Sequence, residues 1–138
     1  MPFALEPHVA GQLGAGTALD ATVHPPVVRS VEYVLDAPTS QDILESFPVY
    51  LVSNDIAAQL ARASLRGFVL RDARITVSRE YLDEFGNAQH KDYQWLYPTP
   101  DLAADCWIDD QLRLCVSGAM MDVLATGTLD ACTIIEIP

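Results

Sequence analysis

Alternation between apolar and polar positions predicts a strand at residues 27–35, VVRSVEYVL. Successive side chains of a strand point to opposite faces, so Val31, Tyr33 and Leu35 share one face. The next segment, 36–46, contains hydroxyl side chains suited to an N-cap and an aspartate suited to a first turn. That pattern predicts one or two helical turns before the next strand.

The segment 1–26 follows neither a strand period nor a helix period. It mixes glycine, alanine and proline and ends in a Pro-Pro pair. Such a segment offers no continuous apolar face to bury. We therefore expect 1–26 to be a flexible N-terminal arm, followed by a single domain at 27–138.

Two later segments, 49–75 and 112–137, repeat one pattern. At one constant offset and without gaps, Val52 aligns with Val116 and Ser53 with Ser117. In each copy an apolar run ends at a serine that can cap a helix, the helix carries one apolar stripe, and a second apolar run follows. The same offset pairs Ile56 with Met120, Leu60 with Leu124, Leu65 with Leu129 and Leu70 with Ile134. Each copy therefore predicts a strand, a helix and a second strand. The likeness between the copies comes either from duplication of one ancestral segment or from chance similarity.

These elements predict an α+β fold. We expect a mixed sheet of about five to six strands with two main helices, built from two similar strand-helix-strand units. Between the copies, Tyr93, Trp95 and Tyr97 share one face of a further strand, which the prolines after it end. The remainder of 80–110 carries turn residues and acids, and we expect it to form exposed loops.

Composition limits the classes of partner. The chain has 138 residues, half of them hydrophobic, which suits one folded domain with one core. Eight basic and 19 acidic residues give a net charge of -11. This charge repels phosphate backbones and anionic lipids, so we expect neither nucleic acid nor a membrane as a partner. The sequence shows neither a long apolar run nor a signal-peptide pattern, and we expect a cytoplasmic protein.

The charge is segregated along the sequence. Residues 62–79 sum to +4 and residues 80–110 to -7. If Trp107 is exposed among these carboxylates, the segment suits a contact with a basic protein. The alternative is that the charged residues are ordinary solvated surface and that Trp107 lies in the core. The residues that we predict to bind a partner are Asp83, Glu84, Asp92, Asp101, Asp105, Trp107, Asp109 and Asp110.

Candidate catalytic and metal-binding patterns are weak. The three histidines lie far apart, and Cys106, Cys115 and Cys132 form no CxxC pair, so we expect no metal, no cofactor and no disulfide framework. The string GQLGAG at 11–16 lacks the preceding strand and the lysine of a phosphate-binding loop. We therefore expect no catalytic residues and no enzymatic activity.

Two strings carry a family resemblance: SFPVYLVSNDIAAQLARASLRGFVLRDARI, and YQWLYP followed by LRLCVSGAMMDVLATGTLDACTIIEI. They resemble small bacterial immunity proteins of polymorphic-toxin and contact-dependent competition systems, over residues 46–137. The resemblance implies a non-enzymatic protein that binds and neutralises a cognate toxin. It assigns no binding residues, and the paired CxxC motifs of some such families are absent from this sequence.

The leading hypothesis is thus an acidic immunity or inhibitor protein that binds a basic toxin through residues 80–110. The alternative is a small-molecule-binding or accessory enzymatic domain, with a pocket between sheet and helices lined by Tyr93, Trp95 and Tyr97. A third possibility is that the repeat creates a self-complementary edge for a homodimer.

Overall fold

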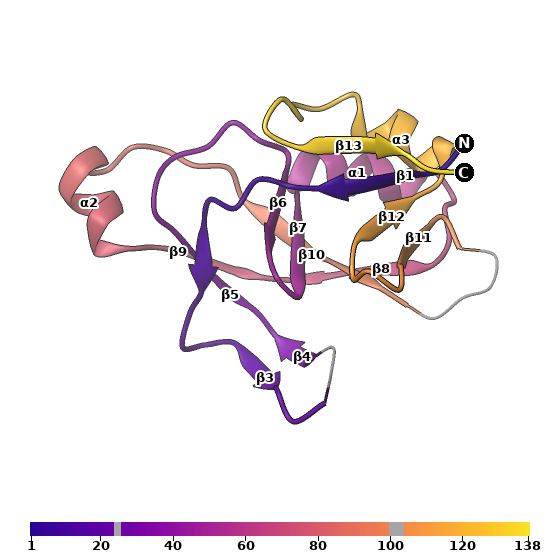
Figure 1. Cartoon of the computed structure of the whole chain (residues 1–138). Helices are drawn as coiled ribbons and strands as arrows, with labels where there is room; N and C mark the ends of the chain where they lie inside the picture. Colours follow the sequence, from indigo (N-terminus) through magenta and orange to yellow (C-terminus); the bar gives the residue numbers. More distant parts are fainter. Residues whose placement is uncertain (24–25, 100–103) are drawn as a thin grey trace.

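The computed structural model describes residues 1–23, 26–99 and 104–138. This part of the chain forms three helices and 13 strands in four small, mostly antiparallel sheets (Figure 1). The α+β class is as expected from the sequence. The expectation of one sheet with five to six strands is wrong.

The first copy of the repeat contributes two strands, β7 and β8, to one four-stranded sheet, which we call the β7 sheet. Its strand order is β6-β7-β10-β8, and every neighbouring pair is antiparallel. Helix α1 (Asn54–Arg62) connects β7 to β8. The strands are β6 (Ile43–Ser46), β7 (Val49–Ser53), β8 (Phe68–Asp72) and β10 (Tyr93–Pro98).

The second copy contributes two strands, β12 and β13, to a matching sheet, the β12 sheet. Its strand order is β11-β12-β1-β13, again antiparallel throughout. Helix α3 (Gly118–Leu124) connects β12 to β13. The strands are β1 (Phe3–Glu6), β11 (Cys106–Ile108), β12 (Leu114–Val116) and β13 (Thr133–Glu136).

In both sheets the two strands of the repeat are parallel to each other and separated by a strand from elsewhere in the chain. Strand β10 lies between β7 and β8, and β1 lies between β12 and β13. The registers match, because Arg71 pairs with Trp95 in one sheet and its repeat counterpart, Ile135, pairs with Ala4 in the other. The two copies therefore share their strand-helix-strand order and also their alignment against the inserted strand.

Serine caps start both repeat helices, as the sequence predicted. The Ser53 hydroxyl accepts the Ile56 amide at 3.4 Å, and the Ser117 hydroxyl accepts the Met120 amide at 3.1 Å. Such caps satisfy amides that lack partners in the first helical turn.

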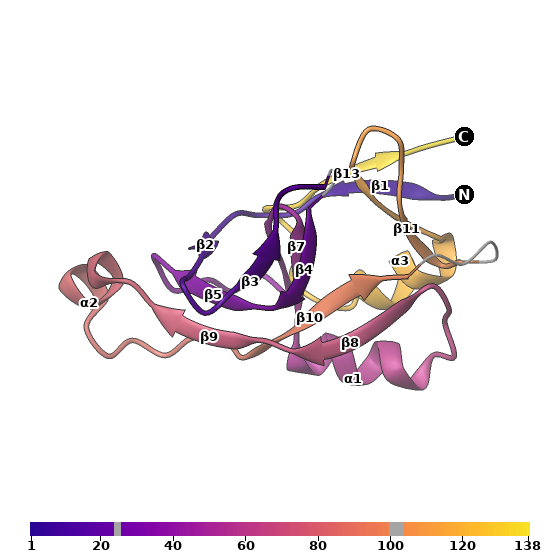
Figure 2. The same cartoon turned by 90° about the horizontal axis from the view of Figure 1, so that it is seen from below.

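One core joins the two sheets and their helices. Helices α1 and α3 contact each other, and their apolar stripes pack with the inner faces of both sheets (Figures 1 and 2). A bridge between His8 and Leu44 further links the segment after β1 to β6. None of the helices in the described ranges is long and apolar enough to cross a membrane.

A second layer covers the opposite, outer face of the β7 sheet. It contains β2 (Gly11–Leu13), β5 (Glu32–Leu35) and β9 (Arg74–Val77) in one sheet, β3 (Ala18–Asp20) and β4 (Val27–Ser30) in another, and helix α2 (Arg79–Phe85). Tyr33, Leu35 and Tyr81 from this layer pack in one buried cluster with Leu51 and Trp95 of the β7 sheet.

The N-terminal segment differs from the loose arm that we expected. Residues 1–23 contain β1, β2 and β3, and Ala4 and Leu5 are buried. Strand β1 is too short to show a clear period. Its place is fixed by pairing with β12 and β13, which come from the other end of the chain.

Several local predictions are also wrong. The predicted strand 27–35 is broken at Val31 into β4 and β5, and the helical turns predicted in 36–46 are replaced by β6. The apolar run 68–77 divides into β8 and β9, which belong to different sheets. Helix α2 and strand β11 lie where we expected loops.

The position of β1 makes a stability prediction. Leu5 is 2% exposed in the core, so Leu5→Ala should lower the free energy of unfolding by about 2–5 kcal/mol. Leu19→Ala, at a leucine that is 45% exposed in β3, should change it by less than about 0.5 kcal/mol. Urea unfolding checks both, and equal, small effects would restore the loose-arm interpretation.

Candidate functional site

The residues predicted to bind a partner do not form one surface. Asp83 and Glu84 lie on α2, whereas Trp107 lies on β11, at the opposite end of the molecule in both views (Figures 1 and 2). Asp92 lies beside the start of α1, where its carbonyl accepts the Asn54 amide at 3.0 Å. Asp101 lies outside the described residues.

Asp105 and Asp109 are held by hydrogen bonds within their own chain, and Asp83 forms an exposed ion pair with Arg79 at 3.9 Å. Asp109 accepts both the Nε and the Nη2 of Arg113, at 2.9 and 2.8 Å. Burial alone would raise the pKa of Asp109, but the hydrogen bonds from Arg113 lower it overall. Asp105 accepts the Ser117 hydroxyl at 2.7 Å. Both aspartates thus have structural roles, and Asp110, at the turn between β11 and β12, remains exposed.

An apolar concavity lies near the turn between β6 and β7, the end of β10 and the end of β11. We call it the groove, and its volume is about 220 Å³. Trp95, 2% exposed, lies at its base, while Val27, Phe47 and Ile108, 44%, 43% and 36% exposed, lie along its rim. The full lining is Pro26, Val27, Val28, Phe47, Pro48, Tyr50, Trp95, Tyr97, Pro98 and Ile108.

A cation lies against two rings of the groove. The guanidinium of Arg71 is 4.7 Å from the ring centre of Tyr97 and 5.5 Å from that of Trp95. Those two rings contact each other edge to face, with centres 5.1 Å apart. The guanidinium is attracted to the ring faces, and the three side chains hold one another in place.

The three aromatic residues of β10 do not line a pocket between sheet and helices. Tyr93, Trp95 and Tyr97 pack on the outer face of the β7 sheet, away from α1, whereas Leu96 faces the helices. Tyr93 is buried and donates its hydroxyl to the Gln41 carbonyl at 2.8 Å. The predicted location of the alternative pocket is therefore wrong, although Trp95 and Tyr97 do line the groove.

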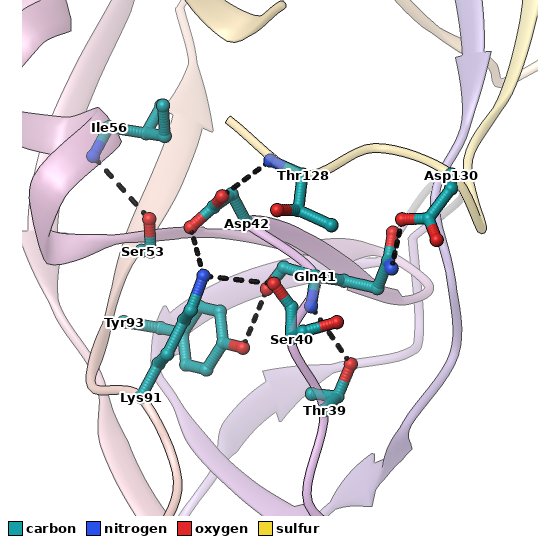
Figure 3. A network of polar contacts seen from close by, with 10 residues as sticks. All are labelled: Thr39, Ser40, Gln41, Asp42, Ser53, Ile56, Lys91, Tyr93, Thr128 and Asp130. Carbon is teal, nitrogen blue, oxygen red and sulfur yellow. Dashed lines mark hydrogen bonds and ion pairs between the residues drawn. The ribbon is translucent and has the colours of Figure 1, made fainter. Parts of the chain in front are cut away.

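A buried carboxylate, Asp42, ties the first copy of the repeat to the second (Figure 3). Its Oδ1 accepts Lys91 Nζ at 2.7 Å, and its Oδ2 accepts the Thr128 amide at 2.6 Å. Its own amide donates to the Thr128 carbonyl at 3.0 Å, and its carbonyl accepts the Ser53 amide at 2.9 Å. Thr128 lies between α3 and β13, so one aspartate joins both halves.

Asp105 makes the corresponding tie in the other direction. Its amide donates to the Arg66 carbonyl at 2.7 Å, and its Oδ2 accepts the Arg66 amide at 2.9 Å. Its carbonyl accepts the Ser117 amide at 2.8 Å. Arg66 lies between α1 and β8, the place that Thr128 occupies in the second copy. The two halves are therefore joined by a reciprocal pair of Asp–Ser–loop contacts.

Sequence reasoning missed these ties because it started each copy of the repeat too late. Asp42 precedes Ser53, and Asp105 precedes Ser117 at nearly the same spacing, so an aspartate comes before each hairpin of the repeat. A glycine also adjoins the loop partner of each aspartate. A Cβ at Gly127 would lie 2.6 Å from the Asp42 carboxylate, and one at Gly67, where φ is +94°, would collide with Ala104.

The three cysteines are free thiols, with Cys106 and Cys115 buried and Cys132 partly buried. Burial raises the pKa of Cys106 to about 12 and those of Cys115 and Cys132 to about 11. Nucleophilic thiols need the opposite shift. In the described part of the chain, no group of three histidine, cysteine or acidic side chains is arranged to hold a metal ion.

Comparison of the chain with family models, with curated proteins and with solved structures found no match. The function is therefore inferred from the geometry of the site and from the sequence resemblance described above.

The Asp42 tie makes a pH prediction. Burial raises the pKa of Asp42, but hydrogen bonds from Lys91, Ser53 and Thr128 outweigh it and bring the pKa below 3.8. Asp42 then stabilises the fold above pH 3.8, and this contribution disappears as the pH falls through the lowered value. Asp42→Asn should lower the free energy of unfolding by about 1–3 kcal/mol at pH 7 and by much less at pH 3.

Denaturant unfolding at pH 7 and pH 3 tests this difference. Asp110→Asn is the matched control, because Asp110 is exposed and should give no change at either pH. A loss from Asp42→Asn of the same size at both pH values would show that the charge of Asp42 does not contribute.

Proposed function

We propose that the protein is a non-enzymatic inhibitor of the immunity-protein type. It binds a basic toxin domain with a fixed stoichiometry and neutralises it in the cytoplasm. The groove and the adjoining turn between β11 and β12 form the contact. The observation that carries the proposal is that exposed apolar side chains surround the aromatic base of the groove.

The residues around the groove are typical of a protein interface. Tight interfaces bury a few aromatic and aliphatic side chains in a pocket and surround them with polar groups. Here Phe47 and Ile108 form an apolar rim. Asp110, exposed shortly after Ile108, supplies a carboxylate beside it.

The net charge supports a cationic partner. A charge of -11 attracts a basic domain over distances longer than a hydrogen bond and accelerates the encounter. Because the acidic residues are spread over several faces, this attraction belongs to the whole molecule. The groove would then supply the specific contact.

Growth protection is the direct test. The chain is produced in bacteria together with the toxin domain encoded beside its gene, and growth is compared with and without the chain. Protection is expected from the wild type. Ile108→Asp should lose it and weaken binding at least tenfold, because a carboxylate then replaces an apolar contact at the groove rim.

Leu82→Asp is the matched control for this variant. Leu82 is 51% exposed on α2, at the other end of the molecule, so the same change should leave protection intact. Growth arrest despite the wild-type chain, or equal protection by Ile108→Asp, would contradict the proposal.

Salt provides a second test on the same pair of proteins. Screening of charge between about 50 and 500 mM NaCl should lower the association rate constant by about tenfold or more and change the dissociation rate constant less. Stopped-flow or surface-plasmon measurements separate the two rates. An association rate that is independent of salt would exclude the electrostatic part of the proposal.

The alternative function is binding of a small molecule in the groove. The groove, with a volume of about 220 Å³ and an aromatic lining, suits a small aromatic ligand, and Arg71, which is not part of the lining, holds the Trp95 and Tyr97 rings in place. Thermal unfolding with benzoate and indole-3-acetate tests this alternative. A rise in the midpoint that Arg71→Gln abolishes would favour it over protein binding.

A further inference from the structure

The two halves of the molecule differ in what lies on the outer faces of their sheets. In the β7 sheet, one row of paired residues crosses all four strands: Leu44, Leu51, Trp95 and Arg71. The three apolar members of this row are buried beneath the layer that contains Tyr33, Leu35 and Tyr81. The chain itself therefore covers this face.

The same row exists in the β12 sheet, where it consists of Trp107, Cys115, Ala4 and Ile135. Cys115 is the repeat counterpart of Leu51, and Ile135 is the repeat counterpart of Arg71, at the same offset in the sequence. None of these four residues belongs to either of the two core clusters found among the described residues.

The accessible part of this row is apolar at both ends. Cys115 and Ala4 are small and fully buried, whereas Trp107 is half-buried and Ile135 is 39% exposed. The β13 strand is an edge, and all four of its residues are exposed. Its counterpart β8 carries Arg71 at the corresponding position, and a charged residue on an edge strand discourages further association. Strand β13 has isoleucine there.

The charge around this face is negative. The four strands β1, β11, β12 and β13 contain no lysine, arginine or histidine, and Glu6 lies on the outer face with Ala4. The nearest arginine in sequence, Arg113, is already bound to Asp109 at 2.8 Å. A partner that covers the row therefore meets apolar ends and the exposed carboxylate of Glu6.

From these observations we infer that the outer face of the β12 sheet, with Trp107 and Ile135 at its ends, is a docking surface for a basic protein domain that covers it as the chain's own layer covers the β7 sheet. This inference rests on the proposed function and names a second contact for the same toxin. Trp107 and Ile108 are consecutive residues of β11 and point to opposite faces of the β12 sheet, so a partner that contacts both must reach around the β11 edge.

The test uses the purified chain and the toxin domain encoded beside its gene, with affinity measured by calorimetry. Ile135→Arg places the residue of the matching position, Arg71, on an exposed edge, so the fold should be kept. It removes an apolar contact and repels a basic partner, and the dissociation constant should rise at least tenfold. Ile135→Glu removes the same contact and attracts that partner, so its dissociation constant should rise less.

A larger loss of affinity in Ile135→Arg than in Ile135→Glu indicates docking of a basic partner. A general loss of packing would lower the affinity of both variants by the same amount. Leu82→Arg on α2 is the control and should bind as the wild type does. Equal affinity of wild type and Ile135→Arg, with binding still lost in Ile108→Asp, would overturn this inference and leave the proposed function in place.

Two other outcomes would also overturn it. Failure of the wild-type chain to bind the toxin would remove the proposed function and this docking surface together. Light scattering of the chain alone provides the third arm: a wild-type dimer that Ile135→Arg converts to a monomer would assign the surface to a second copy instead of a basic partner.

Discussion

The exchange of a central strand between the two halves is the constraint on which the rest of the structure depends. Strand β1 completes the sheet of the second copy, and β10 completes that of the first. Neither repeat can pair its two parallel strands directly, because each pair is separated by the inserted strand. The fold therefore forms only when the N-terminal residues and the C-terminal half meet, and Asp42 and Asp105 fasten the crossing points from both directions.

The sequence predicts those parts of the arrangement whose residues lie close together along the chain. Ser53 and Ser117 were predicted as caps because hydroxyl, turn and apolar stripe lie within a few residues of each other. Strands β1 and β11 are short and their pairing partners are distant or equally short, so no period identifies them. The apolar run of β8 and β9 reads as one strand because pattern alone does not reveal that the chain passes from one sheet to another at Ala73.

The candidate site shows the same division. Trp107 was singled out from its sequence neighbours, and the aspartates around it were assigned to the same surface by proximity in sequence. Asp105 and Asp109 instead serve the fold, and the carboxylates of α2 lie at the far end of the molecule. The groove was missed because its lining comes from separate segments of the chain, which meet only after the two sheets have closed on one core.

The two similar halves differ in their outer faces: the chain covers that of the β7 sheet, whereas Trp107 and Ile135 at the ends of the β12 row stay accessible, and we propose that the partner binds there. Hydrogen exchange of the chain, alone and mixed with the basic toxin domain that we propose as its partner, tests this claim most directly. Amides in 106–116 and 133–136 should exchange more slowly on binding, with no change in 79–85. Slower exchange confined to 79–85 would contradict it.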